Sequence, residues 1–98
     1  MVKDNKTFEL KVFTIPTCSV CSAAKQIAYD VAKKLGLSYR EVNMGTSEGL
    51  KEGMALNITS APSITLNDEI IVVGRLISRE KLEEEVRRRL EKMNTYGV

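Results

Sequence analysis

Residues 14–21 have the sequence Thr14-Ile15-Pro16-Thr17-Cys18-Ser19-Val20-Cys21. This segment is the junction between two different patterns of apolar residues. Upstream, from Phe8 to Ile15, apolar and polar residues alternate and then become mostly apolar, which predicts a central strand that ends at Pro16. Downstream, from Cys18 to Leu35, apolar residues recur every three or four positions, which predicts an amphipathic helix of about four turns. Gly36 follows at the position where helices commonly end in a left-handed residue.

The pattern beyond Gly36 predicts two helices and three strands. They are a strand over residues 38–44, a short helix over about 48–56, strands over 63–66 and 69–73, and a final helix with its N-cap at Ser78. The order β-α-β-α-β-β-α predicts an α/β fold with a four-stranded mixed sheet, in which the first two strands are parallel and the last two form an antiparallel hairpin. We expect the first and third helices on one face and the short second helix on the other. Because Gly49 and Gly53 are weak helix formers, we expect packing of Leu50 and Met54 to hold the short helix in place.

The composition bounds the size, compartment and partners of the protein. Its 98 residues, 43% of them hydrophobic, fit a single domain over residues 1–98 with a polar leader at 1–7. The net charge of +2 argues against a nucleic-acid partner, because glutamates surround the basic run at residues 87–89. We expect no membrane span, since no apolar run approaches ~18 residues. We expect no signal peptide, because residues 1–6 carry charges of both signs and lead into no apolar h-region. Two cysteines and no histidine do not suit a secreted disulfide scaffold, so we expect a cytoplasmic protein.

The two cysteines, Cys18 and Cys21, are the candidate catalytic residues. Two thiols at i and i+3 on the first turn of a helix lie on one face, within the ~4.4–6.8 Å Cα separation of a disulfide. At the helix start, free backbone N–H groups and the positive end of the dipole favour the thiolate of Cys18 and lower its pKa. We expect Cys21 to be less exposed and less acidic. Cys18 is therefore predicted to attack a partner disulfide, and Cys21 to resolve the mixed disulfide.

Three other interpretations of the cysteine pair stay open. Two lone cysteines can be small core hydrophobes. They can also bind zinc or an iron–sulfur cluster, but a tetrahedral zinc site needs four ligands and this chain offers two cysteines and no histidine. Such a binding module would need a dimer or a borrowed small thiol to complete its ligands. The third interpretation is an adaptor whose cysteines are idle.

Three segments resemble the thioredoxin superfamily, most closely its small thioredoxin/glutaredoxin-like members. They are residues 14–21 as quoted above, Ser60-Ala61-Pro62-Ser63-Ile64, and Gly74-Arg75. The resemblance extends from about Leu10 to Met93. It implies a thioredoxin-like fold and a dithiol–disulfide oxidoreductase, an electron carrier whose redox-active centre reduces protein disulfides and which a separate reductase reduces in turn. We also expect a monomer with no cofactor, metal, nucleic-acid or membrane partner.

The resemblance also implies which residues contact the substrate. In this family the proline before the third strand follows a cis peptide bond, lies against the cysteine pair and helps to present backbone groups to the substrate. By this resemblance, Ala61 and Pro62 are predicted to contact the substrate. Thr17, next to the cysteine motif, is the third predicted substrate-binding residue. The buried aspartate of typical thioredoxins falls, by simple offset, on Val12. Water or another group of the chain must therefore accept the proton of Cys21.

Overall fold

The structure is a computed structural model that describes residues 8–95, and the side chains of residues 8–92. The leader predicted at residues 1–7 lies outside the described residues. The elements are β1 (Glu9–Thr14), α1 (Cys21–Leu35), β2 (Ser38–Asn43), α2 (Ser47–Ala55), β3 (Ser63–Leu66), β4 (Glu69–Val72) and α3 (Arg79–Thr95). Their order confirms the predicted β-α-β-α-β-β-α sequence of elements. No helix in this part of the chain is long and apolar enough to cross a membrane.

The strands form one mixed sheet in the order β2-β1-β3-β4. β1 pairs in parallel with β2 and antiparallel with β3, and β3 pairs antiparallel with β4, as predicted. β1 is central, and five of its six residues are buried. The parallel register sets Val12 beside Glu41 and Thr14 beside Asn43, so the carboxyl ends of β1 and β2 lie at the same edge of the sheet.

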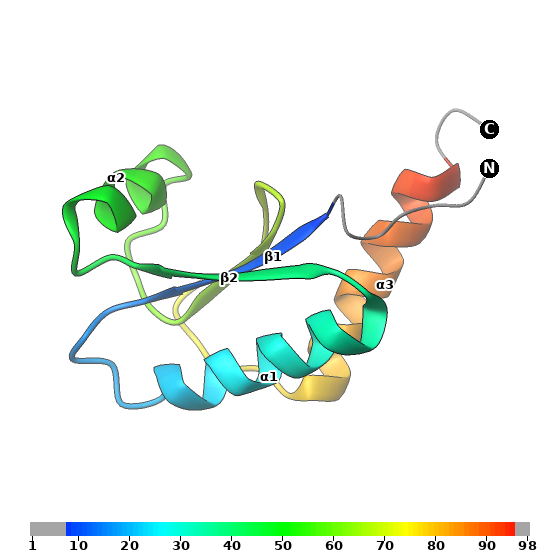
Figure 1. Cartoon of the computed structure of the whole chain (residues 1–98), viewed down its shortest axis with the longest axis horizontal. Helices are drawn as coiled ribbons and strands as arrows, with labels where there is room; N and C mark the ends of the chain where they lie inside the picture. The colour runs from blue at the N-terminus through cyan, green and yellow to red at the C-terminus, as the bar shows by residue number, and fades with distance from the viewer. Residues whose placement is uncertain (1–7, 96–98) are drawn as a thin grey trace.

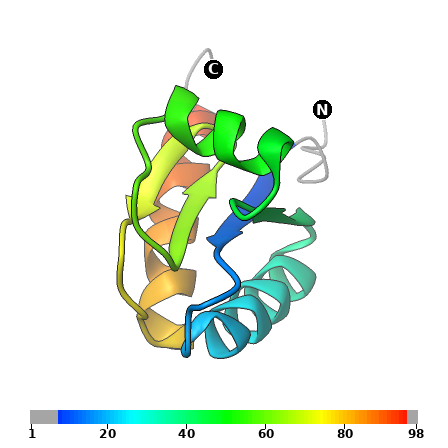
Figure 2. The same cartoon turned by 90° about the vertical axis from the view of Figure 1, so that its left-hand side faces the viewer.

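Helices cover both faces of the sheet. Figures 1 and 2 show α1 and α3 on one face and α2 on the other, as predicted. The first face carries the larger core, which includes Leu10, Val12, Ala28, Val31, Ile64, Leu66, Leu82 and Val86. The second face carries a smaller cluster of Phe13, Val42, Met44 and Ile58. Because side chains alternate along β1, the strand supplies apolar residues to both cores.

The first helix begins later than the sequence pattern predicts. α1 starts at Cys21, with Val20 as its N-cap residue, so the prediction of a helix from Cys18 is wrong. The backbone turns before it: the Cys18 N–H donates to the Ile15 carbonyl at 3.2 Å. Val20 matches the apolar spacing but is 40% exposed. The other end is as predicted, since Gly36 takes a left-handed conformation with φ 74°.

The second helix is held by its glycines, and the predicted role of Leu50 and Met54 is wrong. Leu50 is 47% exposed and Met54 is 61% exposed, whereas Gly49 and Gly53 are buried. A Cβ atom at Gly53 would lie 2.6 Å from the Met44 sulfur. A Cβ atom at Gly49 would collide with the backbone carbonyl of Asn43, so α2 lies too close to the end of β2 for a side chain at that position. The helix begins after Thr46, whose hydroxyl accepts the Gly49 N–H at 3.0 Å.

One charged residue is buried in the central strand. The Nζ atom of Lys11 lies 3.0 Å from a carboxylate oxygen of Glu52 on α2 and 3.1 Å from one of Asp68 in the β3–β4 turn. Arg40 on β2 binds the same Glu52 at 2.6 Å. These ion pairs connect α2 to β1 and β2, and β1 to the β3–β4 turn. A buried ammonium is tolerated here because two carboxylates satisfy it.

Candidate functional site

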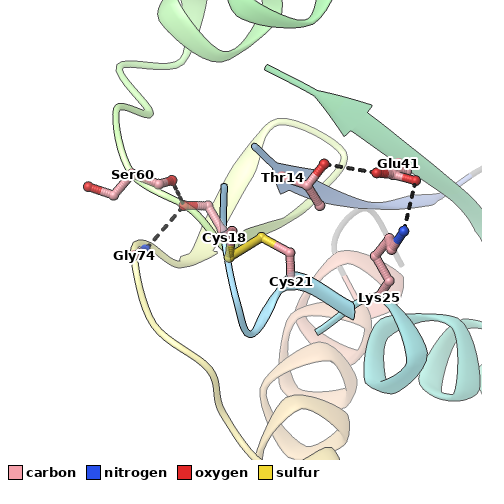
Figure 3. The surroundings of a disulfide bond; sticks show 8 residues. Thr14, Cys18, Cys21, Lys25, Glu41, Ser60 and Gly74 are labelled. Carbon is pink, nitrogen blue, oxygen red and sulfur yellow. Dashed lines mark hydrogen bonds and ion pairs between the residues drawn. A yellow bond between two sulfur atoms is a disulfide. The ribbon is translucent and has the colours of Figure 1, made fainter. Parts of the chain in front are cut away.

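The predicted cysteine pair lies where β1 leads into α1. Cys18 belongs to the connecting loop, and Cys21 is the first residue of the helix. The two form a disulfide with a Cα separation of 5.5 Å, within the range expected from their spacing (Figure 3). Cys21 is 5% exposed, whereas Cys18 is half-buried and accessible to solvent. The predicted difference in exposure between the two residues is therefore present.

The N-terminus of α1, which is the positive end of the helix dipole, lies beside this pair. Val20 makes no side-chain cap hydrogen bond, and the first turn contains no acidic residue. The N–H groups of that turn and the positive end of the helix dipole are therefore free to interact with an anion. Cys18 lies on the loop that enters this terminus. A negative charge on its sulfur would be stabilised there.

The Ala61–Pro62 peptide bond is cis, as predicted. Pro62 is buried, and its loop is joined to the loop after β4: the Gly74 N–H donates to the Pro62 carbonyl at 3.0 Å and to the Ser63 hydroxyl at 3.2 Å. The Ser63 hydroxyl in turn donates to the Ser60 carbonyl at 2.7 Å. Figure 3 shows Ser60 and Gly74 among the surroundings of the disulfide. These hydrogen bonds join the loop before β3 to the loop after β4.

The remaining predicted substrate-binding residues are accessible to a partner. Thr17 is exposed in the turn before Cys18, and Ala61 is half-buried. Apolar side chains on neighbouring segments are exposed as well: Val20 is 40% exposed and Leu76 is 41% exposed. The residues predicted for the substrate contact thus lie on two loops, one before α1 and one before β3.

A pocket of about 180 Å³ opens beside the two cysteines, on the side of β2. Its lining comprises Thr14, Ile15, Pro16, Cys18, Cys21, Ser22, Lys25, Glu41 and Asn43. The Thr14 hydroxyl donates to one carboxylate oxygen of Glu41 at 2.8 Å, and the Lys25 ammonium lies 3.6 Å from the other (Figure 3). Burial raises the pKa of the neighbouring Tyr39, and the negative charge of Glu41 raises it further.

Sequence reasoning did not identify Thr14, Lys25 or Glu41 as parts of the site. Lys25 is one helical turn after Cys21, so its spacing was a usable signal. Thr14 and Glu41 meet only because β1 and β2 pair in one particular register. Among the residues with described side chains, no three His, Cys, Asp or Glu residues are grouped so as to hold a metal ion. A metal site at the cysteines would need ligands from outside this part of the chain.

Comparisons with known proteins agree with this geometry. A family model described as "Thioredoxin domain" matches residues 8–87. A protein of Archaeoglobus fulgidus named "Probable Thioredoxin" is 32% identical over 89 residues, which cover 91% of this chain and 96% of that protein. A thioredoxin of Methanocaldococcus jannaschii is 27% identical over 82 residues, covering 84% of this chain and 95% of that protein.

Solved structures show the same fold. Thioredoxin 1 of Thermosipho africanus superposes with a TM-score of 0.68 at 19% identity, covering 88% of this chain and 98% of that one. A mutant thioredoxin of Halobacterium salinarum superposes with a TM-score of 0.69 at 16% identity, covering 87% of this chain and 80% of that one. The predicted thioredoxin-like fold is confirmed. With its disulfide-bonded cysteine pair, its sheet order and these relatives, the chain belongs to the thioredoxin domain family of thiol–disulfide oxidoreductases.

Proposed function

We propose that this protein reduces disulfide bonds in other proteins, with Cys18 as the attacking thiol and Cys21 as the resolving thiol. The observation that carries the assignment is the unequal burial of the pair: Cys18 is accessible, whereas Cys21 is 5% exposed. A partner's disulfide can reach only the first sulfur. The positive end of α1 supports the same order, because it favours a thiolate on the loop that precedes the helix.

The reaction is a two-step exchange that conserves electrons. The Cys18 thiolate attacks one sulfur of the substrate disulfide, forms a mixed disulfide and releases the other sulfur as a thiolate. Cys21 then loses its proton and attacks the Cys18 sulfur. The Cys18–Cys21 disulfide forms, and the second substrate sulfur leaves. The substrate has gained two electrons and the protein has lost two, which a separate reductase must return.

The substrate chain is proposed to lie across the Ala61–Pro62 loop and Thr17. The hydrogen bonds from Gly74 hold that loop in place, so its backbone is presented in one arrangement. Residues 1–98 are proposed to act as one domain, as a monomeric electron carrier of the small thioredoxin/glutaredoxin-like type. The proposed compartment is the cytoplasm, where partner disulfides are short-lived and a reductase is available.

Covalent trapping of partners tests the order of attack. With Cys21→Ser, Cys18 still attacks but nothing in the chain resolves the mixed disulfide, so conjugates accumulate. With Cys18→Ser, the remaining thiol is too buried to attack, and conjugates are not expected. Both variants are used to capture proteins, and the products are run on gels without and with dithiothreitol.

Each outcome of the trapping experiment has one meaning. Conjugates from Cys21→Ser alone that disappear on reduction support the proposal, and their masses identify the targets. Equal trapping by both variants would contradict the order of attack. If neither variant traps partners and both lose a bound metal, the cysteines belong to a binding module instead.

A further inference from the structure

Glu41 lies where a proton acceptor for the resolving step would be useful. Its carboxylate lines the same pocket as both cysteines. Val12, on the adjacent strand, is fully buried and apolar, and it is the direct register partner of Glu41. Among the described residues that line this pocket, Glu41 on β2 is the one that carries a carboxylate. Its carboxylate reaches Thr14, the last residue of β1, near the edge where the carboxyl ends of the two parallel strands lie and where functional groups of α/β sheets are common.

The carboxylate of Glu41 is held by groups from two other elements. The Thr14 hydroxyl, on a residue that is only 4% exposed, donates to one oxygen at 2.8 Å. The Lys25 ammonium lies 3.6 Å from the other oxygen, and Lys25 is four residues after Cys21 on the same helix. Contacts from β1 and α1 thus orient the group before any reaction, which is what efficient proton transfer requires.

We propose that Glu41 accepts the proton of Cys21 during resolution of the mixed disulfide, directly or through one water in the pocket, with Thr14 as its positioning residue. This inference rests on the proposed function. In the step, the Cys21 S–H bond breaks and the proton passes to Glu41. The Cys21 thiolate attacks the Cys18 sulfur, the new disulfide forms, and the substrate leaves as a thiolate. Glu41 then passes the proton to the departing thiolate or to solvent.

The negative charge of Glu41 allows two possible roles of this residue to be told apart by whether its removal speeds or slows the reaction. If Glu41 acted only through its field, its removal would take a negative charge away from the cysteines. Their thiolates would then form more readily, and both steps would become faster. If Glu41 accepts the proton, its removal slows the second step only. The two roles therefore predict opposite changes in one rate.

A two-phase reaction separates the steps. The fully reduced chain is mixed with one equivalent of dithiobis(nitrobenzoate) in a stopped-flow instrument. Attack by Cys18 releases one coloured thiolate, and attack by Cys21 on the resulting mixed disulfide releases a second. Cys21→Ser identifies the phases, because it should give the first release alone. The rates are compared for wild type, Glu41→Gln, Glu41→Asp and Thr14→Val, with Glu48→Gln as a matched loss of charge at an exposed site on α2.

We expect Glu41→Gln to slow the second phase about 10²-fold at pH 7, without slowing the first. The deficit should shrink as the pH passes the ordinary thiol value of ~8.5, because hydroxide then removes the proton. Besides the two cysteines, the described titratable side chains that line the pockets around Glu41 are Lys25 and Tyr29 on α1 and Tyr39 on β2. The second phase of Glu41→Asp should be faster than that of Glu41→Gln but slower than that of wild type. Thr14→Val should have a second phase slower than wild type, and Glu48→Gln should match wild type in both phases.

Three results would overturn the inference. They are a second phase that is unchanged or faster in Glu41→Gln, an equal loss in both phases, and a loss that does not vary with pH. If Glu41→Gln does not fold, the same comparison of phases with Thr14→Val and Glu41→Asp decides the matter. Release of only one equivalent by the wild-type chain is a different failure, because it would contradict the proposed exchange between Cys18 and Cys21.

Discussion

At the scale of single residues, the site depends on how differently two neighbouring sulfurs are placed. Cys18 is accessible on a loop that runs into the positive end of α1, and Cys21 is buried at the first position of the helix. In the reduced protein we expect Cys18 to react with iodoacetamide at least ten times faster than Cys21 at pH 6.5, because only Cys18 combines exposure with stabilisation of its thiolate. Peptide mass mapping of partly alkylated protein measures the ratio. Equal labelling would remove the assignment of Cys18 as the nucleophile.

Pro62 supports a second prediction at this scale. It is buried, and its carbonyl accepts the Gly74 N–H that joins the two loops beside the cysteines. Alanine keeps this carbonyl but lacks the ring that fixes φ, so the loop is held less firmly for the substrate. Pro62→Ala should therefore lower the rate of reduction of a protein disulfide about tenfold or more. The rate of release from dithiobis(nitrobenzoate), a small reagent, should change much less. Equal losses with both substrates would contradict the role of this loop in substrate contact.

Part of the site was predictable from single residues and part was not. Cys18 and Cys21 are recognisable from their spacing, and the cis bond before Pro62 follows from the family resemblance. Glu41 carries no local signal, because a glutamate in an alternating strand is ordinarily a solvated residue. Its place beside the sulfurs is set by the pairing of β1 with β2, which brings together residues 27 positions apart.

At the scale of elements, α2 shows how tertiary contacts override local preference. The sequence pattern placed this helix within one residue at either end, but it assigned the contact to Leu50 and Met54. Helix propensity counts Gly49 and Gly53 as weaknesses. In the structure they are the contact surface, since α2 lies directly against the end of β2. The start of α1 is a similar case. The apolar spacing predicts a helix from Cys18, but residues 15–18 form a turn, and the helix begins only at Cys21.

The α2 contact leads to a prediction about stability. A Cβ at Gly49 would meet the backbone carbonyl of Asn43, which cannot move aside as a side chain can. Gly49→Ala should therefore lower the free energy of unfolding by about 1–3 kcal/mol, although alanine is the better helix former. Urea denaturation measures the change. Met54→Ala, at a position that is 61% exposed, is the control and should stay within about 0.5 kcal/mol of wild type. A stabilised Gly49→Ala would contradict the close packing of α2.

At the scale of the whole molecule, ion pairs around Lys11 connect the sheet to α2. Burial alone would lower the pKa of Lys11, but its hydrogen bonds to Glu52 and Asp68 outweigh this and raise it. Hydrogen bonding to Arg40 and then to Lys11 lowers the pKa of Glu52 below its ordinary 4.5. The folded state therefore binds fewer protons than the unfolded state near pH 4. This contribution to stability is present above pH 4.5 and is lost as the pH falls through the folded value.

Glu52→Gln tests this linkage. The variant leaves the buried Lys11 with Asp68 alone, so we expect it to be less stable than wild type by about 1–3 kcal/mol at pH 7. As the pH is lowered through 4.5 the difference should shrink, because wild type loses the same interaction by protonation. Urea denaturation at a series of pH values provides the comparison, with Glu48→Gln as control. A difference that stays constant down to low pH would show that the carboxylate charge of Glu52 is not what stabilises the fold.

The central claim is that Cys18 and Cys21 together transfer two electrons to the disulfide of another protein. The most direct measurement mixes the fully reduced chain, free of other thiols, with an oxidised protein that has one accessible disulfide. The reaction is quenched in acid, free thiols are tagged, and intact masses are recorded. We expect the chain to lose two tags for every two that its partner gains, with neither change in Cys18→Ser. A wild-type chain that keeps both thiols, or that stops as a covalent adduct with its partner, would contradict the account.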